Sequence, residues 1–183
     1  MAIPLDQFAA FDIENENKDL YSYNNGELNL TLSCGSMWGA GNTAENLFLV
    51  NVPGDTFRME CTLDLIPVNV GEQAGLVLYG DNNNYIKHVR EFVDAHYVLT
   101  ARELTDVEPK VLFKEAYEPS TVTLGMDVSP SGITMGWKSE DGAITGKQQI
   151  ENLLGGFGPL RAGIFCHGQD AQKSVRFSDF SIS

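Results

Sequence analysis

Basic residues are scarce in this sequence. Only 12 lysines and arginines stand against 25 aspartates and glutamates in 183 residues, which gives a net charge of −13 at pH 7. A surface of that charge repels phosphate backbones and anionic lipid headgroups. We therefore expect no nucleic-acid partner and no membrane partner, whereas neutral sugars, cations and basic proteins stay compatible with the charge.

Cysteines and long apolar runs are scarce as well. Cys34, Cys61 and Cys166 are odd in number and share no metal-ligand spacing, so we expect buried free thiols rather than a disulfide scaffold. No apolar run approaches the ~20 residues that span a bilayer. The first 20 residues also lack the basic and apolar regions of a secretory signal. Free thiols without a signal favour a cytoplasmic location, although a domain cut from a larger enzyme would look the same.

Helical periodicity is nearly absent, and a period of two dominates. Polar and apolar residues alternate in 27–32, 121–128 and 133–138, which is typical of half-buried strands. Residues 129–132 have the length and composition of a hairpin turn between the last two. Only 148–155 resembles a turn of helix, and 45–50 is ambiguous. Further strands are predicted at 57–65, 74–79, 85–92, 97–103, 111–113, 160–167 and 175–182.

About a dozen short strands separated by turn signals predict an all-β fold of the sandwich or barrel type. No repeat, linker or low-complexity tract divides the chain, so we expect one domain over residues 1–183. Strand 73–79 is apolar on both faces and should be covered on both sides. Its neighbour 85–92 carries long polar residues on both faces. That pattern is typical either of the floor of a groove or of a solvated outer face.

The most recognisable stretch of the sequence is the run QAGLVLYGDNNNYIK, residues 73–87. This run resembles a block of the concanavalin A-like sandwich found C-terminal in family 43 glycoside hydrolases of the β-xylosidase and arabinofuranosidase type. The same block occurs in stand-alone "1349" domain proteins of unknown function. The runs at 46–49, 53–57 and 60–64, and the closing strand at 177–182, also fit. The resemblance implies a two-sheet antiparallel jelly roll whose last strand pairs with its first.

The resemblance also implies a calcium ion where the first and last strands meet. Asp12 and Asp179 are the candidate carboxylate ligands, and the alternative is an ordinary surface pair. A second candidate is the loop 81–84, whose alternative is a simple hairpin turn.

Signals for catalysis are weak. The three histidines have no metal-ligand spacing, and no nucleophile elbow is present. Glu91 and Glu103 lie on neighbouring predicted strands and could form a pair, but 25 acidic residues produce pairs by chance. Retaining glycoside hydrolysis requires two carboxylates about 5 Å apart.

Signals for sugar binding are stronger. Trp38 lies in a Gly-rich loop, where its indole is either a stacking platform or a lid over the core. Trp137 follows the core face of its strand. The hydrogen-bonding residues predicted for a groove are Gln73, Tyr79, His88, Arg90, Arg102 and Glu103. Alternation puts His88 and Arg90 on one face and Lys87 on the other, so these two sets cannot line one groove.

Three functions follow from these patterns. The first is a non-catalytic domain that binds an oligosaccharide or a polysaccharide such as xylan, as an accessory to a glycoside hydrolase catalytic domain. The second is a stand-alone intracellular protein that acts through protein contacts. The third is a glycan-active hydrolase that uses Glu91, Glu103 or His88.

Overall fold

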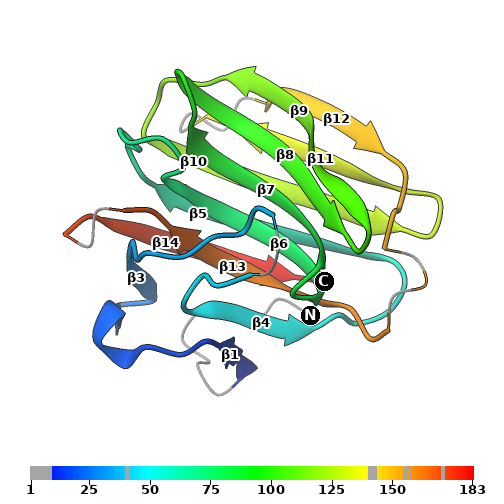
Figure 1. The fold of residues 1–183 in the computed structure, drawn as a ribbon, viewed down its shortest axis with the longest axis horizontal. Coiled ribbons are helices and arrows are strands. Elements are labelled where there is room, and N and C mark those ends of the chain that lie inside the picture. Colours follow the sequence, from blue (N-terminus) through cyan, green and yellow to red (C-terminus); the bar gives the residue numbers. More distant parts are fainter. Residues whose placement is uncertain (1–9, 40–41, 140–143, 155, 157, 170–171) are drawn as a thin grey trace.

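Two seven-stranded antiparallel sheets make up the fold in the computed structural model, which describes residues 10–39, 42–139, 144–154, 156, 158–169 and 172–183 (Figure 1). The first sheet, called sheet A, has the order β1 (Asp12–Glu14), β4 (Leu47–Asn51), β13 (Arg161–His167), β6 (Gln73–Asp81), β7 (Asn84–Phe92), β8 (His96–Leu104) and β9 (Val107–Ala116). Sheet B has the order β12 (Ile144–Ile150), β11 (Gly132–Lys138), β10 (Thr121–Ser129), β5 (Phe57–Asp64), β14 (Ser174–Ile182), β3 (Glu27–Thr31) and β2 (Tyr21–Asn24).

The predicted antiparallel concanavalin A-like sandwich is confirmed. The turn at 129–132 joins β10 to β11, with Ser129 opposite Gly132. Two strands, β2 and β12, were not predicted, and β12 includes the start of the segment assigned to a helical turn. Strand β1 corresponds to the first strand on which Asp12 was placed. A single turn of 3-10 helix, Lys18–Leu20, is the one helical element in the described ranges. None of the described helical structure is long and apolar enough to cross a membrane.

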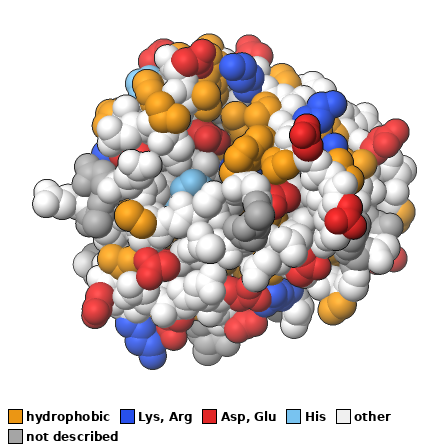
Figure 2. Space-filling model, in the orientation of Figure 1, with side chains coloured by type: hydrophobic (Ala, Val, Ile, Leu, Met, Phe, Trp, Pro, Cys, Tyr) orange, Lys and Arg blue, Asp and Glu red, His pale blue; other side chains and the backbone are white. Residues whose placement is uncertain are grey.

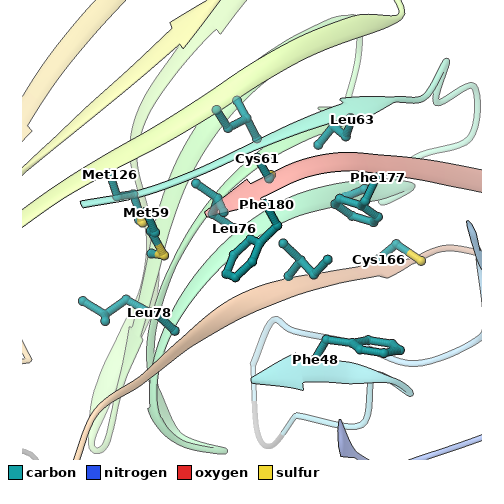
Figure 3. Packing of buried hydrophobic residues seen from close by; sticks show 14 of the residues in the cluster. Phe48, Met59, Cys61, Leu63, Leu76, Leu78, Met126, Cys166, Phe177 and Phe180 are labelled. Carbon is teal, nitrogen blue, oxygen red and sulfur yellow. The ribbon is translucent and has the colours of Figure 1, made fainter. Parts of the chain in front are cut away.

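The core lies between the two sheets. In Figure 3, Leu76 and Leu78 of β6 point from sheet A towards Met59 and Cys61 of β5 and Met126 of β10 in sheet B. These side chains are fully buried, so each contributes roughly 1.5–3 kcal/mol of hydrophobic stabilisation. Trp137 is also buried, as predicted.

The cysteines follow their predicted environment in part. Cys61 and Cys166 are free, buried thiols, and burial raises the pKa of both. Cys34 is exposed, contrary to the prediction, because it lies in the loop after β3 rather than in a strand.

The interior also contains the polar pair predicted for the groove. His88 and Arg90 are fully buried and lie on the inner face of β7. His88 Nε2 donates to the carbonyl oxygen of Gly136 at 3.1 Å, and Nδ1 accepts from Thr100 Oγ1 at 3.0 Å. Burial lowers the pKa of His88 to about 4, so the ring is neutral.

Arg90 occupies the same inner face, and main-chain oxygen atoms accept hydrogen bonds from its two terminal nitrogen atoms, whereas its buried Nε has no partner among the described residues. It donates to the carbonyl oxygens of Tyr97 and Glu118 at 3.4 and 3.3 Å and lies over the ring of Tyr117. His88 and Arg90 therefore support the packing of the two sheets and do not line an outer groove, because strand alternation points them away from it.

A second apolar cluster covers the outer face of sheet A. It joins Val77 and Tyr79 of β6, Tyr85 and Val89 of β7, and Phe165 of β13. The loop between β3 and β4 (described at residues 32–39 and 42–46) packs on this face and contributes the fully buried Met37 (Figure 1). The prediction that β6 is covered on both sides is confirmed, and the outer cover is this loop.

Glu72 anchors the loop between β5 and β6 (residues 65–72). Its carboxylate is 0% exposed and accepts hydrogen bonds from Lys173 Nζ at 2.7 Å, Val68 N at 2.7 Å and Asn69 Nδ2 at 2.6 Å. Burial raises the pKa of Glu72, but these donors outweigh it and bring the pKa down to about 2. The loop they hold carries Val70 and Gly71 at the rim of the pocket described below.

We predict that Glu72→Gln destabilises the protein at pH 7, and that the loss becomes smaller as the pH falls. A depressed carboxyl pKa contributes stability above the unfolded value near 4.3, and this is lost as pH falls through about 2. The contribution is of the order of 3 kcal/mol at neutral pH. Urea unfolding of both proteins at pH 7 and pH 3 tests this, and an equal difference at the two pH values would contradict it.

Candidate functional site

A cavity of about 360 Å³ opens on the outer face of sheet A beside the β3–β4 loop. It is lined by Trp38, by apolar residues that include Val70, Val93, Leu99 and Val111, and by the polar residues Ser36, Gln73, Lys87, Glu91, His167 and Gln169. We call this the Trp38 groove. Its volume falls in the range typical of small-ligand sites, and an apolar lining with a few placed polar groups is their usual composition.

Strand register aligns three of these polar residues. His167 on β13 lies opposite Gln73 on β6, and Gln73 lies opposite Glu91 on β7. Neighbouring strands are about 4.8 Å apart, so the row extends roughly 10 Å across the sheet. A straight row of polar groups on a rigid sheet suits an elongated ligand.

Lys87 forms the floor of the groove. Its side chain is almost fully buried, and Nζ donates to Gln73 Oε1 at 2.7 Å and to the carbonyl oxygen of Met37 at 3.1 Å. The ammonium group also lies 5.5 Å from the centre of the Trp38 ring, a cation–π distance. Burial lowers the pKa of Lys87, and the nearby carboxylate of Glu91 opposes this shift. Lys87 thus joins the sheet, the loop and the indole.

Trp38 is half exposed, at 46%. The loop around it is held by a hydrogen bond from Thr43 N to Ser36 O at 2.9 Å, and Trp38 N donates to Ser36 Oγ at 3.1 Å. The indole of Trp38 stands at the groove with a solvent-facing surface and does not fold back as a lid over the core. The residue of this loop that is buried on the sheet is its neighbour Met37.

His167 and Glu91 carry the unused hydrogen-bonding capacity. His167 is 7% exposed, and its Nε2 atom has no hydrogen-bond partner among the described residues. Burial, with Lys87 adding to it, lowers the pKa of His167 to about 3, so the ring is neutral. Burial raises the pKa of Glu91, and the nearby positive charge of Lys87 opposes this shift. No hydrogen bond joins the carboxylate of Glu91 to another described side chain.

Two predicted residues share the groove face but lie under the loop. Tyr79 is buried, and its hydroxyl group has two acceptors within reach of its single proton, Glu14 Oε2 at 2.8 Å and Asn82 Oδ1 at 2.6 Å. Glu103 is buried and accepts from the hydroxyl of Tyr85 at 2.8 Å. Arg102 bonds within its own hairpin, to the carbonyl oxygen of Glu108 at 3.3 Å. Of the predicted groove residues, the structure brings Trp38 and Gln73 together there.

The strand register places Glu91 and Glu103, the two acids of the predicted hydrolase, far apart. Glu91 pairs with Tyr97, and Glu103 pairs with Tyr85 at the other end of the same two strands. Six residues along β8 correspond to about 20 Å, well beyond either carboxylate spacing used by glycosidases. His88 is buried between the sheets and cannot assist. The prediction that Glu91 and Glu103 form a catalytic pair is wrong for this geometric reason.

The two predicted calcium ligands lie on different sheets. Asp12 on β1 forms an ion pair with Arg161 at 3.0 Å, whereas Asp179 is exposed on β14. The last strand pairs with β3 and β5, and β1 pairs with β4, so the expected pairing of first and last strands is wrong. The described ranges contain no group of three or more histidine, cysteine, aspartate or glutamate side chains suited to a metal. Calcium binding stays a prediction.

Sequence reasoning missed His167 and gave Glu91 a catalytic role. A signal for Glu91 was available, because alternation puts it on one face with Lys87. His167 ends a largely apolar strand and resembles a core histidine in sequence. Only the strand order, which puts β13 beside β6, reveals that it extends the polar row.

The molecular surface agrees with the composition. On the face shown in Figure 2, acidic side chains are spread widely, and a group of hydrophobic side chains lies over β8 and β9. Val107 and Val111 of β9 are among the exposed large hydrophobic residues, at 46% and 41%.

Solved structures share this fold. A variant of a GH43 protein from Bacillus licheniformis has a TM-score of 0.83 and 18% identity, over 94% of this chain and 36% of that one. A xylan β-1,4-xylosidase from Bacillus halodurans has a TM-score of 0.75 and 15% identity, over 91% and 35%. A functionally unknown protein from Saccharomyces cerevisiae has a TM-score of 0.74 and 15% identity, over 96% and 97%.

The chain spans only about a third of the length of the two Bacillus proteins, and identities this low establish the fold alone. No curated protein sequence matches it. A family model described as the β-xylosidase C-terminal concanavalin A-like domain matches residues 12–183. The sandwich just described is therefore a member of the family of concanavalin A-like domains that lie C-terminal in β-xylosidases.

Proposed function

We propose that the chain is a non-catalytic accessory domain that binds a plant polysaccharide of the xylan type in the Trp38 groove. The observation that carries the proposal is a half-exposed indole beside a row of polar side chains on a rigid sheet. Family membership supports a carbohydrate setting, because similar folds occur in a GH43 protein and in a protein described as a xylan β-1,4-xylosidase.

The groove has the two kinds of contact that a sugar requires. The indole of Trp38 can pack against the apolar C–H face of a sugar ring, and the apolar surface removed from water contributes roughly 25 cal/mol per Å². His167 and Glu91 can bond hydroxyl groups that would otherwise lose water. Since the sheet and the tethered loop already hold these groups in place, little ordering accompanies binding.

We predict that Trp38→Ala weakens binding of xylo-oligosaccharides by about tenfold or more, since a loss of 1.4 kcal/mol corresponds to tenfold. Isothermal titration calorimetry with a series of xylo-oligosaccharides measures this. Val107→Ala is the matched control, because Val107 is equally exposed at 46% but lies outside the groove. Failure of the unaltered protein to bind any member of a broad plant-oligosaccharide panel would refute the proposal.

A second candidate function is docking to a glycoside hydrolase catalytic domain. Ile66, Val68 and Val70 of the β5–β6 loop are exposed by 56%, 53% and 67%. Three neighbouring apolar side chains facing water are typical of a protein contact site. Family membership names the kind of partner, since these domains lie C-terminal in β-xylosidases.

We predict that an Ile66→Ser, Val68→Ser double variant weakens association with a family 43 xylosidase catalytic domain by about tenfold or more, because burying an apolar side chain at a contact contributes roughly 1.5–3 kcal/mol. Analytical ultracentrifugation of the mixture measures the association. Xylo-oligosaccharide binding should stay unchanged, because neither side chain lines the Trp38 groove. Equal association of both proteins would remove this loop from the interface.

A further inference from the structure

The charged groups of the Trp38 groove differ in how many hydrogen bonds they already make within the protein. The ammonium group of Lys87 has two oxygen partners, at 2.7 and 3.1 Å, and lies against the Trp38 ring. It is also almost fully buried. A ligand therefore meets a cation whose hydrogen-bonding capacity is largely used and whose surface is covered.

The carboxylate of Glu91, in contrast, still has hydrogen-bonding capacity for a ligand. It lines the groove, is only half-buried, and has no hydrogen bond to another described residue. A carboxylate only accepts hydrogen bonds, and its two oxygens can accept from two donors at once. Two adjacent hydroxyl groups of a sugar ring match that requirement, whereas a ligand carboxylate would meet like charge.

The other end of the polar row is uncharged. The imidazole of His167 is neutral, and its Nε2 atom is buried without a partner in the described part of the chain. A hydroxyl group can donate or accept, so it satisfies either tautomer of the ring. His167 and Glu91 lie one on each side of Gln73, at about 10 Å from each other. That distance allows separate sugar units to contact each of them.

We propose that the Trp38 groove selects neutral sugar units with free adjacent hydroxyl groups and rejects units that carry a carboxylate, such as uronic acids. This inference rests on the glycan-binding function proposed above and adds the class of ligand. Glu91 is the residue that discriminates, through hydrogen bonds to neutral hydroxyls and repulsion of an anion. The net charge of −13 acts in the same direction at longer range.

The test compares two ligands of equal size at pH 7. One is xylotriose bearing a glucuronic acid branch, and the other is the same oligosaccharide after reduction of its carboxyl group to an alcohol. We expect the unaltered protein to bind the reduced form at least about tenfold more tightly, because opposed like charges are costly at an interface. Glu91→Gln should reduce this ratio at least threefold, since the amide keeps the size of the side chain and removes its charge.

Asp55→Asn is the control for overall charge. Asp55 is exposed in the turn before β5, at the opposite end of that strand from the β5–β6 loop, so the change in net charge is equal but distant. The ratio of affinities should stay as in the unaltered protein. Equal affinity for the two ligands, or tighter binding of the acid, would overturn the selectivity and leave glycan binding standing. Absence of binding to either ligand, and to xylotriose itself, would overturn both proposals.

Discussion

The buried ammonium group of Lys87 is the constraint on which the site depends. A cation removed from water must be compensated by nearby oxygen atoms. Here the compensation comes from a side chain of the sheet, Gln73, and from a main-chain carbonyl of the β3–β4 loop, that of Met37. Satisfying Lys87 therefore fixes the loop on the sheet. With the loop in place, the indole of Trp38 is held beside the polar row.

The sandwich explains why a polar row is available at all. Both faces of β6 and β7 are buried, one against sheet B and the other partly beneath the loop. The loop leaves one end of the outer face uncovered, where His167, Gln73 and Glu91 line up on three neighbouring strands. A site built on strands is held more rigidly than one built on loops. The loop then adds the one aromatic group that strands of this face do not supply.

Local patterns predicted the strands well because alternation is a local property. The hairpin at 129–132, the burial of Trp137 and the double cover of β6 were all predicted correctly. Strand β12 was missed because its run Gly146-Lys147-Gln148-Gln149 has no apolar alternation at the edge of sheet B.

The face of β7 could not be assigned in the same way, because both alternating sets contain long polar side chains. His88 and Arg90 are accommodated in the core by main-chain carbonyls that accept their hydrogen bonds, and two of these, of Gly136 and Glu118, come from residues far along the sequence, so those contacts depend on the tertiary fold. The most direct test of the role of Lys87 is amide hydrogen exchange at Trp38 and Thr43 in Lys87→Met, which keeps an unbranched side chain one atom shorter and removes the ammonium group. Exchange at least about tenfold faster at both amides, with the strands of sheet A unaffected, is the result we predict from a lost tether. Unchanged exchange at both amides would contradict the account.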